Sequence, residues 1–196
     1  MSIFTDWLNV LTTDSMLARV INGKRALTTM NYTEVDVKTG RQRVAQLKTT
    51  VASGVTVSIG FVTGAEPVII KSRIINQIGS TEIDYAAYED RTFTGGSTIN
   101  VVNPNRVTQI ASNVTIKSAV TPDAGGTLYL EPFPILAAGN NTQSRIGGDV
   151  AGMEYHLKAN TSHVFQISNP GTGTATVHWW ITFFEGNSDL PSGEIE

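Results

Sequence analysis

The pattern of hydrophobic and polar positions along the chain predicts one short helix followed by many short strands. Apolar spacings of three and four, which place side chains on one face of an α-helix, occur only near the start. The apolar residues with this spacing are Phe4, Trp7, Leu8 and Leu11. We therefore predict a short amphipathic helical arm within residues 1–28, packed on its own domain or docked on a neighbouring subunit.

The helical pattern can be followed further along the arm. Met16, Leu17, Val20 and Ile21 extend the apolar stripe, and Gly23 is of the residue type that commonly follows the end of a helix. We therefore expect the helix to reach Ile21. An exposed stripe of this kind costs about 25 cal/mol per Å² of apolar surface, so we expect it to be covered by this chain or by a partner.

From Met30 onward the chain consists of short runs rich in threonine, valine and isoleucine, separated by glycine, asparagine, proline and aspartate. Strands are predicted over residues 32–38, 55–61, 68–74, 83–88, 98–102, 114–118, 126–130, 154–158, 163–167 and 175–184. Short strands separated by turn residues are typical of an antiparallel β-sandwich or barrel. A chain of 196 residues is long enough for one main core. We predict an all-β sandwich domain over residues 29–186 and an acidic C-terminal tail over residues 187–196.

The last predicted strand is unusually aromatic. Alternation puts Val177, Trp179, Ile181 and Phe183 on one face. Because that face is wholly apolar, we assign it to the core. The other face carries Trp180 and Phe184, which are then left toward solvent, a covering loop or a partner subunit. Exposed aromatic residues in one strip favour an interface.

Residues 132–153 show no clean period and contain two prolines and a glycine pair. A loop of this length inside a compact domain is usually functional or ordered by a partner, so we treat it as a second candidate contact surface. The residues predicted to contact an oligomer partner or another protein are Phe4, Trp7, Leu8, Leu11, Trp180, Phe184 and Arg145.

Composition excludes several classes of partner. Lys+Arg 14 against Asp+Glu 17 gives a formal charge of -3, so the clustered basic residues that bind nucleic acid are not expected. No run approaches the roughly 20 apolar residues of a membrane-spanning helix, and the acidic start does not resemble a secretory signal. The chain has no cysteine, which removes disulfides and thiolate chemistry. We expect synthesis in the cytosol and no contact with nucleic acid or membrane.

The three histidines are the only candidate metal ligands of note. If residues 159–162 form a tight hairpin, His156 and His163 lie near one another, with His178 on an adjoining strand. No carboxylate is apparent that would orient these imidazoles, and polar residues on strands usually belong to a solvated face. We predict no metal site.

Catalytic motifs are also lacking. The sequence has no Gly-x-Ser-x-Gly elbow, and its glycine pairs lack the helix and lysine that a phosphate loop requires. The acidic residues Glu82, Asp84, Glu89 and Asp90 form a cluster that glycosidase or calcium chemistry could use. Glu82 and Asp84 alternate with Ile83 and Tyr85, however, which fits the wet side of a strand. We expect no enzymatic activity and no cofactor.

Two segments resemble a family of tailed-bacteriophage virion proteins. Residues 85–106, YAAYEDRTFTGGSTINVVNPNR, match its strand end, glycine-rich turn and Asn-x-Asn-Arg corner. Residues 153–171, MEYHLKANTSHVFQISNPG, resemble its Leu-Lys, turn, strand and Asn-x-Gly hairpin, which leads into the aromatic last strand. The resemblance covers roughly residues 70–185. The part before Lys48 departs from the family pattern, which leaves the role of the arm open.

The resemblance implies a decoration or head-surface protein on the phage capsid, built as a jelly-roll β-sandwich. It implies a virion location, the major capsid protein as partner, and assembly with itself, with a trimer preferred. The alternative is a tail or fibre component, or a carbohydrate-binding module for host attachment. In that alternative Trp180, Tyr155 and the 132–153 loop contact sugars. An enzyme of the sandwich class is a third possibility that lacks a recognisable site.

Overall fold

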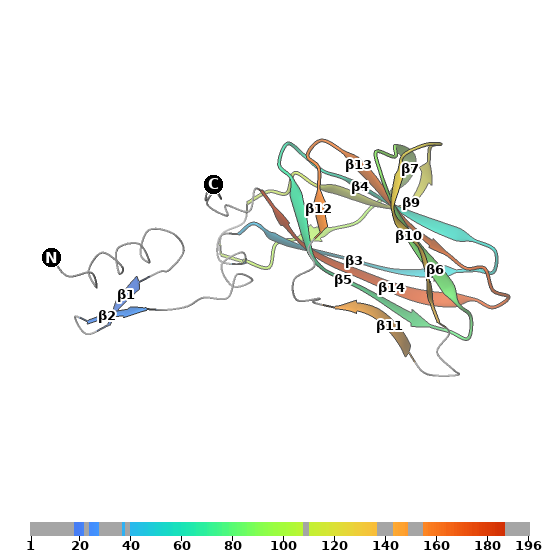
Figure 1. The fold of residues 1–196 in the computed structure, drawn as a ribbon, viewed down its shortest axis with the longest axis horizontal. Helices are drawn as coiled ribbons and strands as arrows, with labels where there is room; N and C mark the ends of the chain where they lie inside the picture. The colour runs from blue at the N-terminus through green and yellow to red at the C-terminus, as the bar shows by residue number, and fades with distance from the viewer. Residues whose placement is uncertain are drawn as a thin grey trace, which may run out of the picture.

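The computed structural model describes residues 18–21, 24–27, 37, 40–107, 110–136, 143–148 and 155–186. In this part the chain forms a two-stranded hairpin and two antiparallel sheets that lie face to face (Figure 1). The all-β prediction is therefore confirmed. The predicted helical stripe from Phe4 to Leu11 and the predicted tail over 187–196 lie outside the described residues.

The two sheets have six strands each. The first, called the β13 sheet below, has the order β10-β6-β13-β4-β9-β7. The second, the β14 sheet, has the order β11-β5-β14-β3-β8, with β12 also paired to β5. The strands are β3 (Gln42–Val51), β4 (Thr56–Val62), β5 (Val68–Ile78), β6 (Ile83–Glu89), β7 (Phe93–Thr98), β8 (Val101–Val102), β9 (Thr115–Pro122), β10 (Thr127–Ile135), β11 (Gln143–Gly148), β12 (Tyr155–Leu157), β13 (Ser162–Ser168) and β14 (Ala175–Glu185). Because β3, β4, β5 and β6 alternate between the sheets, the chain repeatedly crosses over one core.

The core lies between the inward faces of the two sheets, and the last strand contributes to it as predicted. Val177, Trp179, Ile181 and Phe183 are all at most 1% exposed. Aromatic rings join the sheets: the centroid of Phe61 lies 5.4 Å from that of Phe183, and Phe165 lies 6.0 Å from Trp179. Burial of each such ring stabilises the fold by a few kcal/mol.

The predicted extension of the N-terminal helix is wrong. Ala18–Ile21 forms strand β1, which pairs with β2 (Lys24–Leu27) in an antiparallel hairpin. The residues between the two strands are Asn22 and Gly23. This dipeptide is the strongest short-range signal for a two-residue hairpin turn, and the β-branched Val20 and Ile21 favour strand over helix. The helix end predicted at Gly23 is therefore also wrong, because strands lie on both sides of this residue.

The predicted long loop over 132–153 is also partly wrong. Strand β10 continues to Ile135, and Gln143–Gly148 forms β11, which pairs with β5. Nothing in the side-chain pattern of QSRIGG predicts a strand, because its only apolar side chain is Ile146. The hydrogen bonds to the neighbouring strand determine its conformation instead. Arg145 therefore lies in a strand, at the register position opposite Asn76.

Candidate functional site

A buried ion pair closes the end of the sandwich where residue 40 enters it and residue 186 leaves it. The Nε atom of Arg43 lies 2.9 Å from Oε1 of Glu185, and the two side chains are 2% and 6% exposed. The guanidinium also donates to backbone carbonyls, through Nη1 to Gly40 and Gln42 and through Nη2 to Ile110 and Ala111. The Nε atom itself makes no hydrogen bond among the described residues, so the contact with Glu185 is an ion pair by distance, and Nη1 and Nη2 supply the hydrogen bonds that a buried charge requires.

The carboxylate of Glu185 binds the loop that precedes β9. Its Oε1 accepts from the hydroxyl of Ser112, and its Oε2 accepts from the backbone N–H of Asn113 at 2.9 Å. On the other side, the side-chain amide of Asn103 donates to the carbonyl of Gly40 at 2.9 Å. The start of β3, the end of β14 and this loop are thereby held together.

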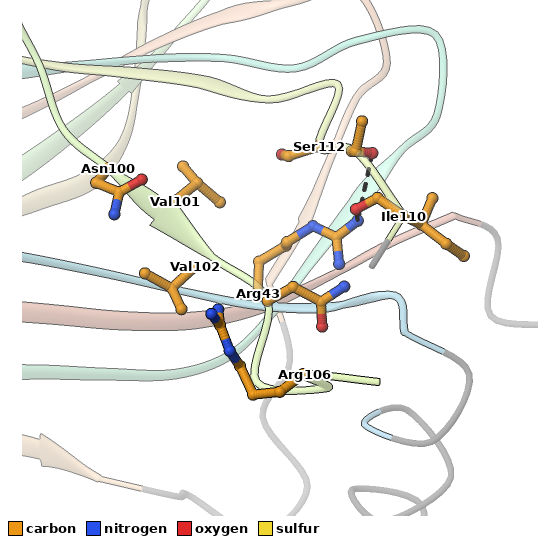
Figure 2. Close-up of a pocket in the computed structure, with 9 residues that line it drawn as sticks. Arg43, Asn100, Val101, Val102, Arg106, Ile110 and Ser112 are labelled. Atoms are coloured by element: carbon orange, nitrogen blue, oxygen red, sulfur yellow. Dashed lines mark hydrogen bonds between the residues drawn. The ribbon is translucent and has the colours of Figure 1, made fainter. Parts of the chain in front are cut away.

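A cavity of about 410 Å³ lies beside this ion pair (Figure 2). It is lined by Arg43, Asn100, Val101, Val102, Asn103, Arg106, Ile110, Ala111 and Ser112. The donors of Arg43 are already engaged with Glu185 and with carbonyls, so this guanidinium is not offered to a ligand. Figure 2 shows the guanidinium of Arg106 beside Val102 and apart from that of Arg43. The cavity is therefore best interpreted as part of a structural corner.

The Asn-x-Asn-Arg motif shapes this corner. The Oδ1 atom of Asn103 accepts from the backbone N–H of Asn105 at 2.9 Å, and Oδ1 of Asn105 accepts from that of Val107 at 3.0 Å. Two consecutive asparagine turns of this kind bend the chain without any regular secondary structure. Arg106 follows them with an exposed side chain.

The Asn-x-Gly motif fixes a second loop region. Asn169 is 1% exposed. Its amide donates to the carbonyls of Val51 and Gly173 at 2.9 and 2.8 Å. Its Oδ1 accepts from the N–H of Gly171 and the hydroxyl of Thr81, both at 3.1 Å. This one side chain joins the loops that follow β3, β5 and β13, so the motif has a role in folding.

A groove of about 680 Å³ lies on the outward face of the β14 sheet. It is lined by Gln46, Leu47, Lys48, Ile74, Asn76, His178, Trp179 and Trp180. Trp180 is 44% exposed, and its indole N–H donates to the hydroxyl of Thr182 at 3.3 Å. The size of the groove is in the range of small-molecule sites, and it combines one exposed aromatic ring with several polar side chains.

Trp180 and Phe184 have different environments, although alternation places both on the non-core side of β14. Trp180 is exposed, as predicted for an interaction residue. Phe184 is only 8% exposed, and Nζ of Lys71 lies 6.0 Å from the centre of its ring. Phe184 is therefore covered within the chain, which is one of the three placements predicted for it, and it is not exposed to solvent as Trp180 is.

Tyr155 does not share a surface with Trp180. It packs against the core from β12, and the guanidinium carbon of Arg73 lies 5.2 Å from its ring centre and 4.8 Å from that of Tyr85. Tyr155 thus lies on the inward side of the β14 sheet. The sugar-contact surface predicted from Trp180 and Tyr155 together is not formed.

The histidines are not brought together. His156 lies on β12 and pairs with β5 in the β14 sheet, whereas His163 lies on β13 in the other sheet. The hairpin that would place them side by side is therefore not formed, since the chain changes sheet between them. Within the described part of the chain, no group of three or more His, Cys, Asp or Glu residues could hold a metal ion.

His163 is a buried base with an unusual environment. It is 0% exposed, and neither ring nitrogen has a hydrogen-bond partner among the described residues. Burial lowers its pKa below the ordinary value of 6.5, with Glu89 and Asp90 opposing this shift and Lys158 adding to it. The ring of Tyr129 packs edge-on at 6.3 Å. The folded protein therefore disfavours the imidazolium.

This burial predicts a loss of stability in mild acid. As the pH falls below about 6.5, the unfolded chain binds a proton at this position and the folded chain does not. The free energy of unfolding then falls until the pH reaches the folded pKa, by about 1.4 kcal/mol for each unit of pKa depression. His163→Phe should lose less stability than the wild type between about pH 7.5 and 5 in urea unfolding. The same substitution at the exposed His156 is the control, and an unchanged pH dependence in His163→Phe would contradict the expectation.

Comparisons with known proteins give no family. No protein-family model matches the chain, and no curated protein matches it. Among solved structures, the VP2 subviral particle of infectious bursal disease virus aligns with 87% of this chain and 46% of its own, at 13% identity and a TM-score of 0.19. The T=1 particles derived from infectious bursal virus align with 89% and 45%, at 11% identity and a TM-score of 0.21. The chain spans less than half of these proteins, and likenesses this weak carry no argument about its function.

The residues that form the ion pair and the groove were mostly missed by sequence reasoning. Of the predicted contact residues that the structure describes, Trp180 lines the groove and Arg145 lies on the strand next to it. Phe4, Trp7, Leu8 and Leu11 lie outside the described residues. Arg43 and Glu185 gave no signal beyond being charged residues at the ends of apolar strands. In the part of the chain that the structure describes, no helix is long and apolar enough to cross a membrane.

Proposed function

We propose that the chain is a non-enzymatic structural protein of a bacteriophage virion, which binds the outside of the capsid and stabilises the shell. In this role it is made in the host cytoplasm, assembles with itself, preferentially as a trimer, and has the major capsid protein as its partner. A ligand that binds only the assembled shell stabilises it by mass action. No chemical step at this chain is needed for that role.

The observation that carries the proposal is the strand order. The chain inserts β7, β8 and β9 between β6 and β10. Without them, β4, β13, β6 and β10 form one set of neighbours, and β3, β14, β5 and the pair β11 and β12 form the other. This interleaving of early and late strands is the arrangement expected of a jelly roll, an architecture used by viral capsid domains and by lectins. It supports the fold that the phage resemblance implies.

The position of the chain ends gives further support. The backbone N–H of Glu185 donates to the carbonyl of Arg41 at 3.2 Å, and the Arg43–Glu185 ion pair lies at the same place. The segments before residue 40 and after residue 186 therefore leave the sandwich from one end. We propose that the arm, with Phe4, Trp7, Leu8 and Leu11, docks from this end on a sister subunit or on the capsid.

Binding to capsids tests the proposal. Particles assembled without this chain are mixed with the purified full-length protein and sedimented. We expect the protein to co-sediment with the particles, to saturate at a fixed ratio to the capsid protein, and to remain in the supernatant without particles. Failure to bind capsids, with binding to isolated tails or fibres instead, would support the tail alternative and overturn the capsid proposal.

A further inference from the structure

The outward face of the three central strands of the β14 sheet is a regular array of side chains. Strand pairing places Lys48, His178 and Asn76 in one row, since His178 is opposite both other residues. The next row is Gln46, Trp180 and Ile74. Directly opposite residues of antiparallel strands share a face, so these six side chains surround one groove.

The described strands β3, β14 and β5 place no carboxylate on this face. Its outward positions are Val44, Gln46, Lys48 and Thr50 on β3, Thr176, His178, Trp180 and Thr182 on β14, and Ser72, Ile74, Asn76 and Ile78 on β5. On β11, the residue opposite Asn76 is Arg145. The groove is therefore complementary to a ligand that carries negative charge.

Trp180 supplies an apolar surface on which a ring of a ligand can lie. Its indole N–H is directed to Thr182 at 3.3 Å within the chain, whereas 44% of the side chain is exposed. The donor is thus already satisfied and the aromatic carbons are left to contact a ligand. The half-buried Ile74 lies opposite Trp180 and extends the apolar surface.

Hydrogen-bonding groups lie around this apolar surface. Gln46 offers an amide donor and acceptor, His178 offers an imidazole, and Lys48 offers three N–H donors with a positive charge. Asn76 lines the groove with its side-chain amide, whose Oδ1 atom is buried without a hydrogen-bond partner among the described residues. A sugar ring has an apolar C–H face and a rim of hydroxyl groups, which is the complement of an aromatic ring with polar neighbours. A carboxylate on the sugar would complement Lys48.

We propose that this groove binds an acidic saccharide, with a sugar ring on Trp180, hydroxyl groups on Gln46, Asn76 and His178, and a carboxylate on Lys48. The class includes uronic-acid and sialic-acid chains, which share this chemistry. The groove would give a virion protein a means of attaching to an acidic glycan surface. This site does not depend on capsid binding, so either function can fail without the other.

A second copy of this chain is a poorer occupant. Pairing the face with itself would bring Lys48 against a surface on which the described strands β3, β14 and β5 place no carboxylate to neutralise it. It would also bury Gln46, Asn76 and Lys48 around one tryptophan, whereas the centres of stable homodimer interfaces are more apolar and depleted of charge.

Titration with matched saccharides tests the proposal. The probes are hexagalacturonate and an α2,8-linked oligosialic acid, each compared with its carboxyl-reduced, uncharged form, in calorimetry with the full-length protein at low salt. We expect one acidic probe to bind and its uncharged form to bind at least about tenfold more weakly. Trp180→Ala should weaken binding of the acidic probe by about tenfold or more, with Trp180→Phe retaining most of it. Lys48→Gln should abolish the preference for the acidic form.

The control for charge is Lys117→Gln, which removes a lysine from β9 in the other sheet and should leave binding unchanged. Thermal melts show whether each variant is folded. The proposal is overturned if neither acidic probe binds the folded wild type, or if binding survives Trp180→Ala. It is equally overturned if Trp180→Ala changes only the oligomeric mass in light scattering, since the face would then be an interface between copies.

Discussion

Replacing Arg43 by methionine is expected to lower the free energy of unfolding by about 3–5 kcal/mol, among the largest effects of any single change in this chain. The substitution leaves the buried carboxylate of Glu185 without its cation. It also removes the donors that bind the carbonyls of Gly40, Gln42, Ile110 and Ala111. Urea unfolding monitored by tryptophan fluorescence measures the loss.

The matched control is Arg106→Met, which removes an exposed arginine from the same corner and should change the free energy of unfolding by less than about 0.5 kcal/mol. The double variant Arg43→Met with Glu185→Leu should recover part of the loss, because no charge is then buried alone. Equal stability of Arg43→Met and Arg106→Met would show that the ion pair does not hold the end of the sandwich.

Replacing Trp179 by alanine is expected to cost about 3–5 kcal/mol, whereas the same change at the adjacent Trp180 should cost less than about 1 kcal/mol. Trp179 is 1% exposed and its ring lies 6.0 Å from that of Phe165, so its removal leaves a cavity in the core. Trp180 is 44% exposed, and its removal leaves no enclosed space. Thermal and urea unfolding of both variants show directly which substitution lowers the free energy of unfolding more.

The stabilities of the two tryptophan variants also show whether Trp180 lies in an interface between copies of the chain. Losses of similar size in the two variants would show that Trp180 is buried in an interface that contributes to stability in solution. That outcome would favour Trp180 as an oligomer contact over a ligand contact. A ranking in which Trp180→Ala is the more destabilising would contradict the assignment of Trp179 to the core.

The parts of the fold that were predictable from sequence depend on side-chain alternation. Val177, Trp179, Ile181 and Phe183 alternate with more polar residues because one side of β14 faces the core and the other does not. Most of the predicted strands fall on observed ones for the same reason. The number of strands and their short spacing then favour a two-layer β structure.

The strands and buried residues that the sequence did not predict are those whose structure depends on contacts with distant parts of the chain. Strand β3 was not predicted, since it contains Arg43 at an inward position where only the distant Glu185 makes a charge acceptable. Strand β11 is formed by pairing with β5 rather than by alternation. Phe184 was assigned to the correct strand, but its burial depends on covering contacts that alternation does not encode.

In the candidate site too, local alternation was predictable from the sequence and the pairing of distant strands was not. Trp180 was predictable as an outward aromatic residue, but its neighbours Lys48 and Asn76 come from strands far apart in sequence. The histidine pairing failed because β12 and β13 are close in sequence yet belong to different sheets. A short connection between two strands resembles a hairpin in the sequence whether or not the strands pair.

Calorimetry of capsids tests the central claim most directly, since the claim is that this chain stabilises a shell. Particles assembled without the chain are heated alone and with a saturating amount of the full-length protein. The account predicts that the disruption temperature of the shell rises and that the rise depends on protein concentration until the sites are filled. An unchanged disruption temperature, at a concentration where folded protein is present in excess of the capsid subunits, would contradict it.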